Sequence, residues 1–395
     1  MQIIEFNNLK QLQSEMLKLN CDSAGIKIMQ EKGLFRGIKI KDIKYQAALI
    51  LKQNMLSLGG DVVTPRDTIS GKVEMVSVLL LGTIAHYKRL CEKLYKQPYG
   101  LSLVAEKISQ KIRNYNTYDS CSLLLSDNRE LSFKTKILVM GILNCTPDSF
   151  SDGGEFHLKD NAINHARQLL KDGADIIDVG GESSRPGAKS ITVQEEGQRI
   201  FPVIKELSGK CVISVDTYKA VIAKEALSLG AQIINDITAL RGDNQMADVI
   251  AESKGPIVLM HMQGTPQTMQ KAPCYDDIMY DLLSFFEERI AFSLKRGIKE
   301  YQIIIDPGIG FGKTTEHNIT IMKNLEQLKS FGLPVLLGPS RKSFIGNILQ
   351  LPVEKRLEGT AAVVCIGIQK GVKIIRVHDV LEMSRIARTT KAILN

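Results

Sequence analysis

Polar side chains follow short apolar runs at regular intervals through the last two thirds of the chain. The runs lead into Asn144, Asp178, Asp216, Asn235, His261, Asp306, Lys342, Arg376 and His378. Asp216, Asp306 and Asn235 supply two carboxylates and a carboxamide, which suit a planar heterocycle that displays adjacent N–H donors. Arg376 offers a rigid fork for an oxyanion, and Asn144 offers an oxygen for Mg2+ or an amide for phosphate. These residue types predict a binding face for a polar heterocycle and an oxyanion.

Two cationic segments in predicted loops add to this set. They are Ser184-Arg185-Pro186 and Ser340-Arg341-Lys342. Their positive charge suits either a carboxylate or a phosphate, and the residue types alone leave both open.

Two other patterns are weaker than they look. Residues 308–314 (G-I-G-F-G-K-T) resemble a nucleotide-binding P-loop, but the first glycine of that motif would fall on Pro307. His261, His317 and His378 lie in separate loops with no pair four residues apart, which argues against a zinc site. We therefore expect neither a Walker-type nucleotide site nor a zinc cage.

The elements that must position these residues form a repeat of strand and helix. Apolar runs predict strands at 137–143, 175–179, 211–215, 232–235, 256–260, 302–305, 334–337 and 372–377. Amphipathic helices are predicted between them, for example at 161–171, 192–207, 219–229, 276–296, 318–329 and 354–369. This rhythm predicts an α/β fold, a (β/α)8 TIM barrel whose site lies at the carboxyl ends of the strands. A doubly wound open sheet is the alternative.

Residues 1–130 predict a smaller N-terminal α/β domain of unknown role. Apolar spacing indicates helices at about 43–58, 86–96 and 103–115, with strands around 60–63 and 76–81. No catalytic constellation occurs there. A stretch of short polar residues at 118–133 is the candidate linker to the barrel, which is expected to span 135–395.

Composition limits the partners of the protein. The net charge is +8, and residues 1–130 carry 19 Lys and Arg against 13 Asp and Glu, so most of the excess is N-terminal. These cations are dispersed among acids, which predicts a solvated surface and no nucleic-acid partner. No uninterrupted apolar run approaches eighteen residues, so no membrane association is expected. The seven scattered cysteines predict reduced thiols and a cytoplasmic location.

Five blocks of sequence resemble the dihydropteroate synthase family. They are 141–154 (G-I-L-N-C-T-P-D-S-F-S-D-G-G), 178–188 (D-V-G-G-E-S-S-R-P-G-A), 214–219 with 234–237 (S-V-D-T-Y-K and I-N-D-I), 305–313 (I-D-P-G-I-G-F-G-K), and 337–345 with 376–380 (L-G-P-S-R-K-S-F-I and R-V-H-D-V). Their order and spacing match the family over essentially all of 135–395. Ser184 stands where the family often has threonine, and Cys145 replaces a commoner aliphatic residue. The core family lacks residues 1–130.

The resemblance implies an enzyme of folate biosynthesis. Such a transferase condenses 6-hydroxymethyl-7,8-dihydropterin diphosphate with 4-aminobenzoate, giving 7,8-dihydropteroate and pyrophosphate with Mg2+ present. By the same resemblance the pterin is held by Asp216, Asn235, Asp306, Lys342 and Met260. The diphosphate is bound by Asn144, Arg376 and His378, with Asn144 as the metal ligand, and these three with Lys342 form the catalytic set. The aminobenzoate pocket is shaped by Thr146, Phe150, Ser184, Arg185, Pro186, Phe311 and Ser340, under two loops that close.

The family implies two further properties, which are competition by sulfonamides for the aminobenzoate pocket and a homodimeric state.

Two other functions compete with the synthase interpretation. A methyltetrahydrofolate:corrinoid methyltransferase shares the pterin-binding barrel, but it has no reason to keep residues 146–154 or 340–342, which are intact. A non-catalytic paralogue would be expected to lose residues such as Asn144 or Lys342, and none is lost.

Overall fold

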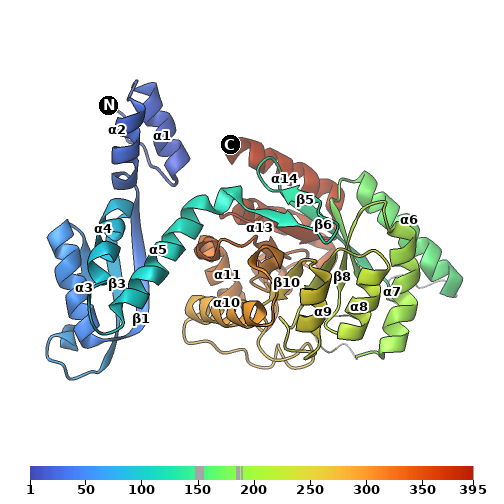
Figure 1. The fold of residues 1–395 in the computed structure, drawn as a ribbon. Coiled ribbons are helices and arrows are strands. Elements are labelled where there is room, and N and C mark those ends of the chain that lie inside the picture. The colour runs from blue at the N-terminus through green and yellow to red at the C-terminus, as the bar shows by residue number, and fades with distance from the viewer. Residues whose placement is uncertain (147–154, 184–186, 188–189, 395) are drawn as a thin grey trace. The chain divides into compact units, whose positions relative to one another are not determined.

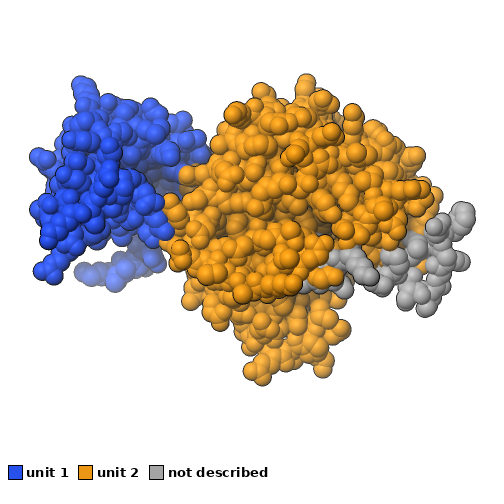
Figure 2. Space-filling view, turned by 90° about the horizontal axis from the view of Figure 1, so that it is seen from below, with its two compact units in different colours: residues 1–118 blue, residues 119–395 orange. Residues whose placement is uncertain are grey.

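The computed structural model describes residues 1–146, 155–183, 187 and 190–394. It divides into two compact units, Met1–Tyr118 and Asp119–Asn395, which are coloured separately in Figure 2. All seven cysteines lie among the described residues and carry free thiols. Within the described part, no helix is both long enough and apolar enough to cross a membrane.

The first unit is a three-stranded antiparallel sheet packed against helices (Figure 1). Its elements are α1 (Leu9–Lys18), α2 (Ser23–Met29), β1 (Phe35–Lys44), α3 (Tyr45–Leu58), β2 (Asp61–Val63), β3 (Met75–Thr83), α4 (Ile84–Leu94) and α5 (Leu101–Thr117). The sheet order is β1-β3-β2. The predicted helices and strands are found within a few residues of their expected bounds, but α1, α2 and β1 were not predicted. Apolar and polar residues alternate in β1 only over residues 38–41 (I-K-I-K), between Gly37 and Asp42, so its strand pattern is short.

The stretch 118–133 differs from the expected linker, because most of it is built into the barrel. It forms a short hairpin of β4 (Ser122–Leu124) and β5 (Glu130–Ser132). Leu123, Leu125 and Phe133 are fully buried or nearly so. They pack in one cluster with residues from all eight barrel strands, namely Leu138, Met140, Ile176, Val212, Ile233, Val258, Ile304, Leu336 and Ile374. The hairpin therefore plugs the amino-terminal end of the barrel.

The second unit confirms the predicted (β/α)8 barrel. Its strands are β6 (Leu138–Asn144), β7 (Ile176–Gly180), β8 (Val212–Asp216), β9 (Ile233–Asp236), β10 (Ile257–Met260), β11 (Ile303–Asp306), β12 (Leu336–Leu337) and β13 (Ile374–Val377). Its helices are α6 (Glu155–Lys171), α7 (Val193–Leu207), α8 (Ala220–Ser228), α9 (Met246–Ser253), α10 (Ile278–Lys295), α11 (Thr315–Lys323), α12 (Ser343–Leu349), α13 (Leu357–Gln369) and α14 (Val380–Leu394), arranged around the strands (Figure 1). The strands are apolar and buried on both faces because helices cover the outside and side chains fill the inside.

Parallel pairing brings the carboxyl ends of the strands together. The sheet runs β11-β10-β9-β8-β7-β6-β13-β12, and a parallel bridge between Ile305 and Val335 joins its two ends, which excludes an open sheet. Asp216 lies in register with Asn235, and Met260 lies in register with Asp306. The register therefore places these four predicted site residues on one rim of the barrel.

Candidate active site

A pocket opens among the carboxyl ends of β9 to β13. Its empty volume is about 330 Å³, and it is lined by Asn235, Ile237, Met260, Asp306, Gly308, Ile309, Phe311, Gly338, Lys342 and Arg376. Six of these ten residues are predicted site residues: Met260, and five residues from three of the five sequence blocks. We call this cavity the central pocket.

Arg376 joins two carboxylates beside the central pocket. Its Nε donates to Asp178 Oδ2 at 2.6 Å, and its Nη2 donates to Asp216 Oδ2 at 2.7 Å. Asn235 Nδ2 also donates to Asp178 Oδ2, at 3.1 Å. Burial works against the charged guanidinium, but the two carboxylates raise the pKa of Arg376 above its ordinary value. Burial raises the pKa of Asp216 to about 7, although Arg376 acts to lower it.

Asp306 and Lys342 line the same pocket. Asp306 Oδ1 accepts a hydrogen bond from the Gly308 amide at 2.7 Å. Burial raises the pKa of Asp306 to about 6. The Lys342 ammonium lies 3.9 Å from the centroid of the Phe311 ring, a cation–π contact. Burial, together with repulsion from Arg376, lowers the pKa of Lys342 to about 8.

A buried lysine shapes the glycine-rich loop that bears Phe311. Lys313 Nζ donates to three carbonyl oxygens, of His261 at 3.1 Å, Gly308 at 2.9 Å and Phe311 at 2.9 Å. Gly308 has φ +64°, and a Cβ on it would lie 2.0 Å from the His261 carbonyl oxygen, so only glycine fits. Lys313 thus directs its ammonium to carbonyl oxygens within the protein and holds the loop in shape.

Ser340 and His378 are hydrogen-bonded to each other. Ser340 Oγ lies 3.0 Å from His378 Nδ1 and accepts from the His378 amide at 3.2 Å. Burial, with Arg376 nearby, lowers the pKa of His378 to about 4, so the imidazole is neutral at neutral pH. The neighbouring Arg341 is paired with Asp379, with its Nε 3.0 Å from Oδ2. Lys342 is therefore the cation of this segment that lines the central pocket.

The first two loops are described only in part. Asn144 ends β6 and is half-buried, and Thr146 follows it. Phe150, Ser184, Arg185 and Pro186 lie outside the described residues. Cys145 is buried, and burial raises the pKa of its thiol to about 12, so it is not a thiolate nucleophile at neutral pH.

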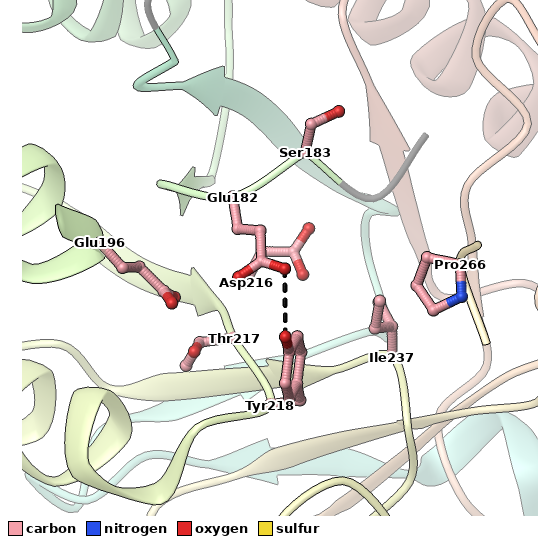
Figure 3. Close-up of a pocket in the computed structure, with 8 residues that line it drawn as sticks. All are labelled: Glu182, Ser183, Glu196, Asp216, Thr217, Tyr218, Ile237 and Pro266. Atoms are coloured by element: carbon pink, nitrogen blue, oxygen red, sulfur yellow. Dashed lines mark hydrogen bonds between the residues drawn. The ribbon is translucent and has the colours of Figure 1, made fainter. Parts of the chain in front are cut away.

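A second pocket lies beside Asp216 (Figure 3). Its empty volume is about 290 Å³, and it is lined by Glu182, Ser183, Glu196, Asp216, Thr217, Tyr218, Ile237 and Pro266. We call it the side pocket. Ile237 borders both pockets, so the two cavities are neighbours on the same rim.

Sequence reasoning assigned no role to several residues that hold this site together. Asp178 was recognised only as the polar residue of a strand, and its contact with Arg376 spans 198 positions of sequence. Lys313 belongs to the stretch that resembles a P-loop, and the sequence indicates no other role for it. Lys219, which pairs with two carboxylates, was noted only as part of a motif. The signal available for each was its place in a motif block, which does not reveal its partner.

Known proteins resemble this chain both in sequence and in structure. Residues 140–378 match the model of the family described as pterin binding enzyme. The dihydropteroate synthase of Bacillus subtilis is 49% identical over 282 residues, which cover 71% of this chain and 96% of that protein. A probable bifunctional folylpolyglutamate synthase/dihydropteroate synthase of Halobacterium salinarum is 37% identical over 370 residues, covering 93% of this chain and 44% of that protein. Because the barrel unit is shorter than 370 residues, this second match extends into the first unit.

Solved structures show the same likeness. Yersinia pestis dihydropteroate synthase in complex with a sulfonamide drug is 41% identical with a TM-score of 0.65, covering 69% of this chain and 99% of that chain. The Xanthomonas albilineans enzyme with 4-aminobenzoic acid is 39% identical with a TM-score of 0.65, covering 70% and 98%. The same enzyme in complex with 7,8-dihydropteroate is 36% identical with a TM-score of 0.62, covering 69% and 98%.

Proposed function

The chain belongs to the dihydropteroate synthase family of pterin-binding enzymes, and on that premise we propose how the residues of its barrel rim share the reaction. The reaction is a transfer that joins 6-hydroxymethyl-7,8-dihydropterin diphosphate to 4-aminobenzoate and releases pyrophosphate. One observation carries the assignment of roles: the central pocket gathers a carboxamide, a carboxylate and two cations from four strand ends.

The central pocket is the pterin site. Asn235 and Asp306 line this pocket and offer acceptors and a donor for the ring edge, and Met260 packs against its face. Asp216 lines the neighbouring side pocket, bonded to Arg376, and offers a further acceptor from there. Lys342 lines the central pocket and holds the pterin with them. The carboxylates of Asp216 and Asp306 accept N–H donors most strongly, and at both oxygens, when they are ionised, and their raised pKa values mean that they ionise near neutral pH.

The diphosphate site lies at the ends of the first and last strands. A diphosphate oxyanion competes with Asp216 for the guanidinium of Arg376, and His378 adds a neutral donor. The Asn144 carboxamide oxygen fits Mg2+ as a single protein ligand. The described residues provide no group of three or more His, Cys, Asp or Glu placed to hold a metal. Mg2+ would therefore take most of its ligands from the diphosphate and water, as it commonly does, and would neutralise leaving-group charge.

The chemical step follows from the charges on the rim. The bond between the exocyclic carbon and the diphosphate oxygen breaks, and its electron pair leaves with pyrophosphate. The carboxylates of the pterin site stabilise the cation that develops on that carbon, while Arg376 stabilises the departing oxyanion. The aminobenzoate nitrogen then bonds to the carbon and releases one proton. No covalent enzyme intermediate is needed, which agrees with the buried, protonated thiol of Cys145.

The aminobenzoate is assigned to the side of the rim that bears the first two loops. Its contacts are Thr146, Phe150, Ser184, Arg185, Pro186, Phe311 and Ser340. The side pocket adjoins this region through Ser183.

We assign the first unit a packing or partner-binding role and the protein a homodimeric state. The free thiols support a reducing compartment such as the cytoplasm.

Pyrophosphate release tests these roles. Purified protein with the dihydropterin diphosphate and Mg2+ should release pyrophosphate in a manner that depends on 4-aminobenzoate. Lys342→Ala and Asn144→Ala should abolish release, whereas Lys210→Ala, which removes an exposed lysine on the outside of the barrel, should not. A folded protein that binds the pterin but releases no pyrophosphate would contradict the proposal.

A further inference from the structure

Asp236, the last residue of β9, organises the turn that follows it. Its side chain is completely buried. Oδ1 accepts from the Thr238 amide at 2.7 Å and from the Thr238 hydroxyl at 2.6 Å, while Oδ2 accepts from the Leu240 amide at 2.7 Å. The Asp236 carbonyl oxygen accepts from the Ala239 amide at 3.2 Å. Asp236 thus binds every residue from 238 to 240.

Two residues of this turn adopt a backbone conformation that side chains disfavour. Ala239 has φ +53° and Leu240 has φ +65°, so both lie in the left-handed region. Neither residue is glycine, and a Cβ atom meets steric strain in that region. Both residues are also buried. The turn therefore does not keep its shape by local preference, and the hydrogen bonds to Asp236 hold it.

The far side of the turn is bonded as well. The Gly242 amide donates to Thr238 Oγ1 at 2.9 Å, so the Thr238 hydroxyl links Asp236 to the end of the turn. Arg241 Nε donates to the Thr238 carbonyl oxygen at 3.0 Å, and its Nη2 donates to the Met262 carbonyl oxygen at 2.9 Å. The turn is thus bonded both to Asp236 and to the chain that follows β10.

Ile237 is the residue that this turn presents to the site. It directly follows Asp236, is 6% exposed and lines both the central pocket and the side pocket, where Figure 3 shows its side chain. It packs in one apolar cluster with Met260 and Phe311, which also line the central pocket. The turn therefore sets the position of one part of the apolar wall of the central pocket.

Asp236 itself faces away from the substrate. Asn235 directs its amide into the barrel, where it donates to Asp178. Neighbouring residues of a strand project to opposite sides, so Asp236 projects away from the barrel interior. Burial raises the pKa of Asp236, although the hydrogen bonds from the turn act to lower it. The linings of the two pockets include Ile237 but not Asp236, so its carboxylate acts on the turn.

We propose that Asp236 is a positioning residue for the pterin, which holds the turn 237–240 so that Ile237 keeps its place in the wall of the central pocket. This inference rests on the proposed function for the identity of the ligand. It assigns Asp236 no contact with either substrate and no part in the bond changes. It differs from a merely stabilising role, because the effect should fall on pterin binding and should pass through Ile237.

Binding of the dihydropterin diphosphate with Mg2+ and without aminobenzoate, measured by calorimetry, tests the proposal. Asp236→Asn keeps the shape of the side chain but replaces one acceptor oxygen by a donor. The Kd should rise about tenfold, the effect of one lost hydrogen bond to a charged group. Asp243→Asn is the matched control, because Asp243 Oδ2 accepts from the Ala220 amide at 2.9 Å and so holds the start of α8 instead of the turn. Its Kd should stay within about twofold of the parent value.

A double-mutant cycle tests whether the effect passes through Ile237. Ile237→Ala should itself weaken pterin binding, and Asp236→Asn added to it should weaken binding little further, because the side chain that Asp236 positions is then absent. Fully additive effects would overturn the proposal, as would an Asp236→Asn protein that binds the pterin like the parent.

Two further outcomes have separate meanings. If Asp236→Asn does not fold, Thr238→Val removes only the hydroxyl that donates to Asp236 and should raise the Kd about threefold, the effect of one neutral donor. An unchanged Kd in that variant would overturn the proposal. A folded parent protein that binds no dihydropterin diphosphate would instead refute the proposed function.

Discussion

Asp178 offers the sharpest test of the charge network around Arg376. Its carboxylate is completely buried, and Oδ2 accepts from both Arg376 Nε and Asn235 Nδ2. Asp178→Asn keeps the shape of the side chain and removes its charge. Arg376 would then be oriented by Asp216 alone, and its Nε would donate to a neutral oxygen.

The expected loss follows from one charge-assisted hydrogen bond. Such a bond contributes about 1.5–3 kcal/mol, and the neutral bond that replaces it about half as much or less. A loss of about 1.5–2 kcal/mol in the transition state lowers kcat/KM by about 10- to 30-fold, at about 1.4 kcal/mol for each factor of ten. Breaking a buried ion pair lowers the free energy of unfolding by roughly 3–5 kcal/mol. The loss in Asp178→Asn should be smaller, because Asp216 still pairs with Arg376.

The assay is kcat/KM for the pterin diphosphate at saturating aminobenzoate, with urea unfolding measured on the same samples. Asp175→Asn is a matched control. Asp175 directly precedes β7, the strand that contains Asp178, and therefore lies at the amino end of the barrel, away from the site. There it accepts from the Val139 amide at 3.0 Å and pairs with Lys136. This control should lose stability and keep kcat/KM. An Asp178→Asn enzyme with unchanged kcat/KM would refute the positioning of Arg376 by Asp178.

Three further predictions concern pH, inhibition and the chain boundary. In the proposal Asp216 and Asp306, with pKa values raised to about 7 and about 6, act ionised, and Lys342, with its pKa lowered to about 8, acts protonated, so kcat/KM should rise between about pH 6 and pH 7 and fall above about pH 8. Lys342→Arg should move the alkaline limb upward in a pH profile of its remaining activity. Sulfonamides should compete with aminobenzoate in initial-rate kinetics, and a non-competitive pattern would contradict the pocket assignment. Deletion of residues 1–118 should leave a folded barrel by circular dichroism, whereas deletion of 1–133 should not, because it removes Leu123 and Phe133, each worth about 2–5 kcal/mol when buried; a stable 1–133 deletion would refute the plug.

The barrel was predictable because its strands are continuous apolar runs that end in polar residues. A run such as 137–143 predicts a strand, and the polar residue that follows it marks the carboxyl end of the strand, where the site of a barrel lies. The plug was not predictable, because β4 and β5 have three residues each and the polar residues around them resemble a linker. Their burial depends on a barrel end that forms only when all eight strands have closed.

The residues of the candidate site also fall into a group that the sequence could predict and a group that it could not. The position of Asp216, Asn235 and Asp306 at the barrel rim could be predicted because each follows an apolar run at a strand end, and their role in binding stays a prediction. Asp178 and Lys219 could not, because their importance lies in partners that are distant in sequence. A strand-end pattern identifies groups that face a ligand, whereas the groups that orient them appear only when side-chain contacts are known.

The same contacts explain why the rim needs both signs of charge before any substrate arrives. Asp178 and Asp306 are buried and Asp216 is nearly so, and burial raises the pKa values of Asp216 and Asp306, which neighbouring cations act to lower. Arg376 and Lys342 are half-buried cations, and desolvation works against the charged form of each. Together they hold opposite charges in fixed positions within a water-poor pocket. The proposed reaction separates charge in the same sense, with a cation on the pterin carbon and an anion on the departing pyrophosphate. Because the charges are already oriented, stabilising that separation needs little reorganisation, and this is why loss of Asp178, which touches neither substrate in the proposal, should slow the reaction.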